Sequence, residues 1–292
     1  MPYKPTSRKH YFGLRTATCC TALIACACWA GATAVSPIDL NKLSEESDLI
    51  VSGSVSKVDE IRRTTVSVSA GTFEARLNVA TLEVDKVFKG RVEGSVISFR
   101  FAFPAARVGY EPVGTGQFGI FFLRKGTEGY AISDPFHPFA LAVPGAPESE
   151  GTPLDRVVAE VAYVFVSPKA TIGIRKLAEM TLMPVLSPRA TAALKIAAHD
   201  QDLGVQTIAM GLLFERGDIS MLDTAAKMLL DPKQVLTENN VNIIAFGIES
   251  GVSDPKAVPL LEELLDCRYE KIRRAAATAL RRSGNESAIG PH

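Results

Sequence analysis

The sequence beyond about residue 150 repeats one helical pattern at a spacing in the low to middle thirties. In four segments, apolar residues stand at offsets 0, 3, 4, 7 and 8, which places them on one side of an α-helix. These segments start at Leu154, Ala190, Leu222 and Ala257, and an interleaved second set starts at Ala170, Val205, Val241 and Ile272. Successive starts are 36, 32 and 35 residues apart in the first set and 35, 36 and 31 in the second. A helix with one apolar side cannot bury it alone, so helix pairs at this period predict an α-solenoid.

Turn and capping residues fall between the predicted helices. Ser187-Pro188 and Ser253-Asp254-Pro255 offer a capping oxygen and a fixed φ at helix starts, and Gly217-Asp218 marks another start. Gly251 and Gly284 stand just past helix ends, where glycine is favoured. The helix boundaries therefore agree with the apolar period.

The region before the repeats has a period of two instead. From Asp48 to about Asp134, apolar and polar residues alternate, as in the run Ile97–Phe103. The alternation changes phase near Val79-Ala80, which predicts a β-bulge there, and Phe118–Leu123 is apolar on both faces, as in a central strand. Five or six strands at this spacing predict a small antiparallel β-barrel, preceded by a short helix over Leu40–Glu46.

The expected fold class is therefore a two-domain chain, all-β and then all-α. Residues 1–34 are predicted to be a signal peptide, and residues 35–134 the β-barrel domain. Residues 135–151, rich in Pro, Ala and Gly, are predicted to be a linker, and residues 152–292 the helical repeat domain.

The N-terminal segment before Val35 has the order of an export signal. A basic stretch from Lys4 to Arg15 is followed by an apolar stretch, and Ala32-Thr33-Ala34 fits the pattern that a signal peptidase reads. Cleavage after Ala34 removes four basic and no acidic residues from the 32 of each, so the mature chain carries about −4. Such a product has no general attraction for nucleic acid. We therefore predict an exported protein, periplasmic or secreted.

Two alternatives to cleavage remain open at the N-terminus. The segment can be retained as a membrane anchor, or Cys26 can be lipidated, since Leu23-Ile24-Ala25-Cys26 resembles the bacterial lipobox. The membrane is therefore expected as a partner only through a lipid or an uncleaved N-terminal anchor. After cleavage at Ala34 only Cys267 remains of the five cysteines, so no intramolecular disulfide can form.

The last repeat carries a family resemblance. Asp254–Asp266, then Ile272–Ala276 with its Ile-Arg pair and Ala-Ala step, then Ala279-Leu280 and Gly284, resemble a bacterial short HEAT repeat. The resemblance extends, less closely, over about residues 152–290. It implies a HEAT-like α-solenoid that presents a surface to a protein partner.

The β region resembles the OB-like barrel of the netrin and metalloproteinase-inhibitor module. Leu49–Val55, Ala80–Gly90 and Phe118–Leu123 carry this resemblance. The inhibitors of that family act through a mature N-terminal cysteine that chelates the zinc of their target. Cleavage after Ala34 leaves Val35 at that position, and the family's disulfides are absent.

No motif predicts catalysis, a cofactor or a metal. The G-x-G-x-x-G match at Gly114–Gly119 precedes a strand instead of opening a helix, so we interpret it as a turn. His137 and His199 do not have metal-ligand spacing, and Cys267 has no histidine nearby in the sequence. The acidic clusters, such as Glu262-Glu263, are interpreted as solvated helix faces.

Four arginines on the last helix are the candidate partner-binding residues: Arg273, Arg274, Arg281 and Arg282. They lie opposite the apolar stripe and can bind an acidic partner, or they can pair with Glu262, Glu263 and Glu270.

The sequence thus predicts a non-enzymatic binding or scaffold protein with a protein partner in the cell envelope. One alternative is a ligand-binding or protease-inhibitor-like protein that acts through the barrel. Another is a hydrolase or lyase with its site at the junction of the domains, which requires a pocket that joins His137 to carboxylates.

Mass spectrometry of the natively exported protein tests the expected processing. Cleavage by signal peptidase gives a chain that begins at Val35, whereas lipidation gives an acylated Cys26 as the first residue. An intact N-terminus that still begins near Met1 contradicts both and indicates a retained anchor.

Overall fold

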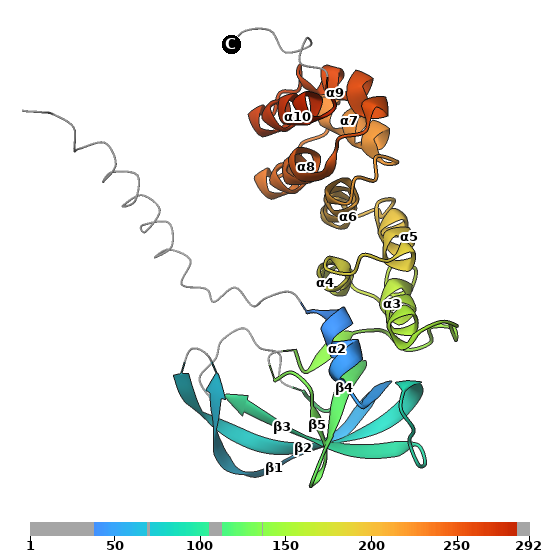
Figure 1. The fold of residues 1–292 in the computed structure, drawn as a ribbon, viewed down its shortest axis with the longest axis vertical. Helices are drawn as coiled ribbons and strands as arrows, with labels where there is room; N and C mark the ends of the chain where they lie inside the picture. Colours follow the sequence, from blue (N-terminus) through green and yellow to red (C-terminus); the bar gives the residue numbers. More distant parts are fainter. Residues whose placement is uncertain (1–37, 69–70, 105–112, 136, 285–292) are drawn as a thin grey trace, which may run out of the picture. The chain divides into compact units, whose positions relative to one another are not determined.

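A computed structural model describes residues 38–68, 71–104, 113–135 and 137–284. The predicted signal peptide and Cys26 lie outside these residues. The residues after Ser36 belong to one compact unit, in which a β-rich region is followed by a helical region (Figure 1). This order of the two regions agrees with the prediction.

Helix α2 (Leu40–Glu46) precedes the sheet, as predicted. The carboxylate of Asp39 caps it by accepting a hydrogen bond from the backbone N–H of Lys42 at 3.0 Å. Leu40 and Leu43 are buried, so the helix is fixed to the rest of the unit by one apolar side.

The sheet closes into a ring. Its strands are β1 (Leu49–Val68), β2 (Gly71–Lys89), β3 (Val96–Pro104), β4 (Phe118–Gly126), β5 (Gly129–Ile132) and β6 (Phe139–Leu141). The order is β1-β2-β3-β5-β4-β6, and a further pairing between β1 and β4 closes the first five strands on themselves. All pairings are antiparallel except the short one between β3 and β5. Closure leaves fewer unpaired strand edges than an open sheet of this size would have.

Bends in the two long strands make this closure feasible. The pairing of β1 with β2 has four breaks in register, at β1 residues Ser56 and Ile61 and at β2 residues Asp85 and Phe88. The pairing of β2 with β3 is regular across Val79 and Ala80, so the bulge predicted there is wrong for β2. The nearest extra residues stand in β1 instead, because a break in register can be taken up by either of two paired strands.

Strand β6 lies inside the predicted linker. Its Phe139 and Ala140 pair with Phe121 and Ile120 of β4, so the sheet extends past the predicted boundary at residue 134. A strand of three residues between prolines is too short to show a period of two, which is why the composition alone predicted a linker.

A helix stands at each of the eight predicted segments. They are α3 (Pro153–Tyr163), α4 (Ile172–Leu182), α5 (Pro188–Ala197), α6 (Leu203–Glu215), α7 (Leu222–Leu230), α8 (Glu238–Gly251), α9 (Val258–Leu264, after the 3₁₀ turn Pro255–Ala257) and α10 (Glu270–Arg282). Thr152, Thr171, Ser187, Asp202 and Thr237 each accept a hydrogen bond at a helix start.

The second helices of the pairs pack in sequence. Helix α4 contacts α6, α6 contacts α8, and α8 contacts α10; we call these four helices the even row (Figure 1). Among the first helices, α3 contacts α5 and α7 contacts α9. Each helix therefore buries its apolar side against helices of its own and adjoining pairs.

One hydrogen bond recurs along the even row. The guanidinium of Arg216, at the end of α6, donates to the carbonyl of Leu182 at the end of α4 at 2.8 Å. The guanidinium of Arg282, at the end of α10, donates to the carbonyl of Ile248 near the end of α8 at 2.9 Å. Both bonds span 34 residues and both satisfy a carbonyl at a helix C-terminus.

Glycines allow α6 and α8 to approach closely. A Cβ at Gly247 would stand 2.3 Å from the carbonyl oxygen of Gly211, and one at Gly251 would stand 1.9 Å from that of Phe214. Only glycine fits at these positions, because the neighbouring atoms are backbone.

The sheet shares one hydrophobic core with helices α3 and α4. A single cluster of buried side chains includes Ile50 and Phe122 of the sheet and Val157 and Leu182 of α3 and α4. The ammonium group of Lys86 on β2 contacts the carboxylate of Glu160 on α3 at 2.7 Å, and both side chains are buried. The β region and the helical region are therefore fixed to each other by packing and by a buried ion pair.

Helix α3 also contacts the end of β2, where β2 has no pairing with β3. The pairing of β2 with β3 ends at Glu83, so the carbonyls of Val87 and Phe88 accept from the guanidinium of Arg156 at 2.9 and 3.3 Å. That guanidinium lies over the Phe88 ring, 5.5 Å from its centre. The backbone carbonyls at the Phe88 bulge are thus hydrogen-bonded to a side chain of α3.

We expect Gly247→Ala to destabilise the protein by about 1–3 kcal/mol, because the added methyl group meets backbone atoms of α6. Urea unfolding monitored by circular dichroism measures this. A loss of stability would indicate the close contact with α6, since alanine normally stabilises a helix interior by up to about 1 kcal/mol over glycine.

Gly173→Ala in α4 is the matched control. The nearest atom to its added Cβ is 3.9 Å away, so this variant should be as stable as the parent or more stable. Equal stability changes for the two variants would contradict the close contact between α6 and α8.

Candidate functional site

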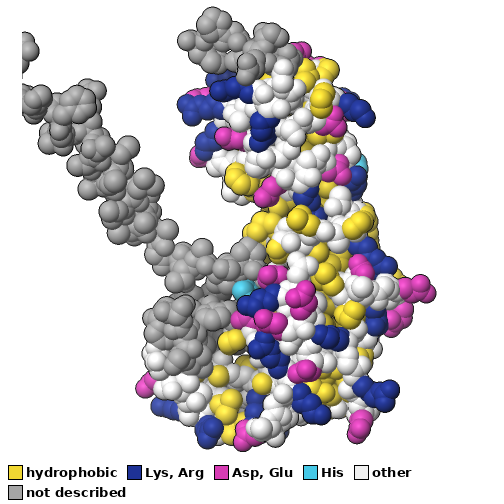
Figure 2. Space-filling model, viewed as in Figure 1, with side chains coloured by type: hydrophobic (Ala, Val, Ile, Leu, Met, Phe, Trp, Pro, Cys, Tyr) yellow, Lys and Arg dark blue, Asp and Glu magenta, His cyan; other side chains and the backbone are white. Residues whose placement is uncertain are grey.

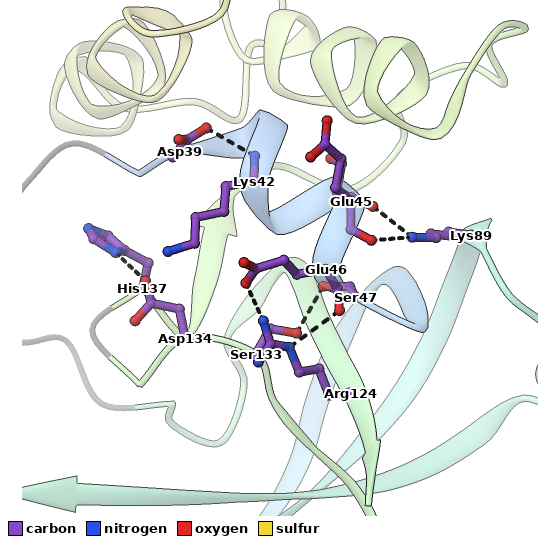
Figure 3. Close-up of polar contacts among 11 residues, drawn as sticks. Asp39, Lys42, Glu45, Glu46, Ser47, Lys89, Arg124, Ser133, Asp134 and His137 are labelled. Atoms are coloured by element: carbon purple, nitrogen blue, oxygen red, sulfur yellow. Dashed lines mark hydrogen bonds and ion pairs between the residues drawn. The ribbon is translucent and has the colours of Figure 1, made fainter. Parts of the chain in front are cut away.

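Polar side chains gather where α2 meets the sheet (Figure 3). Lys89 donates to the carbonyls of Ser44 and Glu45 at 2.8 and 2.9 Å, and Arg124 pairs with the Glu46 carboxylate and donates to its carbonyl. These carbonyls end α2, so two cations from the sheet satisfy a helix C-terminus. The hydroxyl groups of Ser47 and Ser133 are 2.9 Å apart. The arrangement fixes α2 on the sheet.

His137 pairs with one carboxylate at this place. Its Nδ1 lies 3.0 Å from an oxygen of Asp134, and Figure 3 shows the imidazole on the far side of Asp134 from Ser133. Asp134 can orient this ring and stabilise its protonated form. Among the described residues, no three His, Cys, Asp or Glu side chains form a group that could hold a metal ion.

The remaining sequence candidates lie apart from one another. Cys267 is buried, and its thiol contacts the carbonyl of Leu229 at 3.6 Å. His199 is exposed just past the end of α5. The turn interpretation of Gly114–Gly119 is confirmed, since Gly116 has a positive φ of 85° and the backbone N–H of Gln117 bonds to the Gly114 carbonyl immediately before β4.

A buried carboxyl that sequence reasoning missed lies on α4. Glu179 on α4 is fully buried, and neither of its oxygens has a hydrogen-bond partner. Burial raises its pKa from 4.5 to about 9, and the charge of Asp200 adds to the rise, which Lys176 and Arg175 partly oppose. Glu179 is therefore protonated at neutral pH.

Glu160 is the second buried acid that the sequence did not reveal. Burial raises its pKa, and the hydrogen bond from Lys86 acts in the opposite direction. Both acids stand one residue away from an apolar position, Val161 for Glu160 and Ala178 for Glu179. That closeness to the apolar stripe is the one sequence signal that could have found them.

The structure shows two uses for the four arginines of α10. Arg273 donates to the carbonyl of Cys267 at 2.8 Å, and Arg282 donates to the carbonyls of Ile248 and Val252. These two support the backbone. Arg274 pairs with Glu270 at 2.7 Å on an exposed surface, which is one of the predicted pairings. Arg281 is also exposed, and its Nε donates to the carbonyl of Ala277, one turn earlier on the same helix, at 3.5 Å.

The charge of α10 is strongly unbalanced. Its thirteen residues include five basic side chains and one acidic side chain, a net charge of +4 in a chain whose formal net charge is zero. Basic side chains gather over this helix at the upper left of Figure 2. The last helix is therefore the basic end of the even row.

The even row also exposes large apolar side chains. Because the bonds donated by Arg216 and Arg282 are equivalent, each position on α4 or α6 corresponds to a position two repeats later, on α8 or α10. By this correspondence Met180 of α4 matches Phe246 of α8, and both are exposed, at 43% and 61%.

The same correspondence matches Glu215 of α6 with Arg281 of α10, and both are exposed. Each helix of the row keeps some exposed side chains after it packs on its neighbours. We call the exposed surface of these four helices the row face, and it includes Met180, Glu215, Phe246, Arg274 and Arg281.

A pocket adjoins the row face. It has a volume of about 810 Å³ and lies between the end of α4, helix α5 and the end of α6. Met183, Leu186, Glu215 and Arg216 are among its lining residues, and Leu186 is 82% exposed. The pocket therefore continues the row face at Glu215.

No protein-family model matches this chain, and no curated protein matches it either. Within the residues that the structure describes, no helix combines the length and the apolar character needed to cross a membrane.

We expect Glu179→Gln to stabilise the protein at alkaline pH. The native state keeps a proton on Glu179 that the unfolded state releases above about pH 4.5, so parent stability falls as pH rises from 4.5 towards 9. The amide removes this loss, and its gain over the parent should be on the order of 5 kcal/mol at pH 8 and near zero at pH 4.

Urea unfolding at several pH values measures the effect, with the exposed Glu249→Gln as control. A Glu179→Gln gain that is the same at pH 4 and pH 8 would show that the native state does not raise the pKa of this carboxyl.

Proposed function

We propose that the protein is an exported, non-enzymatic scaffold whose helical region is a HEAT-like α-solenoid that binds a protein partner through the row face. Two observations support the solenoid: the contacts from α4 to α10 in sequence, and hydrogen bonds that recur at a span of 34 residues. The ring of five strands, with its bulged long strands, supports a small OB-like barrel ahead of it.

The exposure of Met180 and Phe246 at corresponding positions carries the binding proposal. Large apolar side chains are costly to leave in water, and aromatic and Met side chains are enriched where proteins meet. The two side chains stand two repeats apart, with α6 between them, and neighbouring helix axes in such packing are about 8–10 Å apart. A single extended segment of a partner can span this distance and contact both.

Export is proposed from the N-terminal sequence. Its basic, apolar and small-residue order directs a chain across a membrane, and the partner would then be a protein of the envelope. The buried position of Cys267 leaves no exposed cysteine among the described residues, which suits an oxidising compartment.

One observation favours binding by the β region as a second function. A pocket of about 270 Å³ opens where β3 and β5 part, and its walls include Leu77, Phe101 and Ile132 with Arg100 beside them. A small apolar ligand with one anionic group would fit this lining. Isothermal titration of the protein with medium-chain fatty acids tests this alternative, and no heat of binding would remove it.

Site-specific photocrosslinking in cells that export the protein tests the scaffold proposal. A benzophenone amino acid replaces Phe246 or, separately, Met180, and we expect both positions to crosslink to the same protein. Val235, which is 79% exposed in the segment before α8, serves as the control position. Absence of crosslinks at both row-face positions, or an identical product from Val235, would contradict the proposal.

A further inference from the structure

We infer that the segment bound on the row face is acidic where it meets α10 and apolar where it meets Phe246. This inference rests on the proposed function and adds the chemistry of the partner. It concerns the end of the row formed by α8 and α10, which contact each other along their length.

The positive charge of α10 favours a negatively charged partner segment. Arg274 and Arg281 are exposed, and the helix as a whole carries +4. The pair between Arg274 and Glu270 is an exposed contact one helical turn apart, which is weak and exchanges readily with another carboxylate. Guanidinium groups bind carboxylates through two parallel hydrogen bonds, so a Glu or Asp side chain is the matching group.

The row face also fixes where the acidic residues must lie. Position 281 is Arg in α10, whereas the corresponding position 215 is Glu in α6. A carboxylate of the partner is therefore favoured at position 281 over position 215. With neighbouring helix axes about 8–10 Å apart, the acidic part of the partner begins about one helix spacing from the side chain that packs on Phe246.

A peptide segment with carboxylates at defined positions fits the row face better than a uniformly anionic surface does. Arg273 and Arg282 use donors on backbone carbonyls, so their groups are held in place. Glu270 and Glu249 are exposed on α10 and α8, and they would repel an anionic lipid surface that covered both helices. A peptide can place carboxylates beside the arginines and avoid these two acids.

Fluorescence anisotropy of the full-length protein with labelled synthetic peptides tests the inference. The probes are a peptide that repeats Leu-Glu-Glu and matched peptides that repeat Leu-Ser-Ser or Leu-Lys-Lys. We expect the acidic peptide to bind at least tenfold more tightly than the other two, and its binding to weaken as salt is raised.

Charge reversal identifies the side chains responsible. Arg274→Glu together with Arg281→Glu should weaken binding of the acidic peptide at least tenfold. Lys227→Glu together with Lys233→Glu is the matched control, since both lysines are exposed near the end of α7, and it should leave binding unchanged within twofold. Circular dichroism verifies that each variant is folded.

The outcomes separate the inference from the proposed function. Equal binding of the three peptides, or loss in the Lys227 and Lys233 control, overturns the inference while crosslinking at Phe246 still supports a scaffold. Binding to vesicles of equal parts phosphatidylglycerol and phosphatidylcholine that exceeds peptide binding, and that is lost in the Arg274 and Arg281 variant, identifies a lipid surface and also overturns it. Crosslinking that finds no partner overturns the proposed function itself.

Discussion

The helices of this protein depend on one another because none can bury its apolar side alone. Even α8, the longest of the described helices, has 14 residues, a length at which an isolated helix is marginal in water. Packing between consecutive pairs supplies the missing burial, and the contact between α6 and α8 is the closest of these because Gly211 and Gly247 bring backbone against backbone. The arginines at the ends of α6 and α10 then add a second hydrogen bond to the carbonyls of Leu182 and Ile248, at the ends of α4 and α8.

The need of each helix to bury its apolar side also explains why the helical region packs on the β region. A row of stacked helices needs a cover at its first member, and here α3 packs on the sheet and contributes to the same core as Phe122 and Ile50. The bulge at Phe88 leaves carbonyls of β2 for Arg156, and Lys86 reaches Glu160 in the buried interface. Removing one member of such a buried pair costs about 3–5 kcal/mol, because the other charge is then left buried without a partner.

The helices of the even row keep an exposed surface after they have packed on their neighbours. The row face is the exposed surface of α4, α6, α8 and α10, and it combines Met180 and Phe246 with the basic end formed by α10. In contrast, the polar contacts around α2 are used to hold that helix on the sheet (Figure 3).

The sequence alone determined the β region, the short helix Leu40–Glu46 and the eight later helices, because each follows from a local period of apolar residues. It also identified the four arginines of α10, since charge on one helix can be counted. It could not determine β6, the sites of the bulges or the closed ring, which depend on pairings between distant strands. The buried acids and the correspondence of Met180 with Phe246 were decided by tertiary structure alone, because burial is a property of neighbours that only the folded chain brings together.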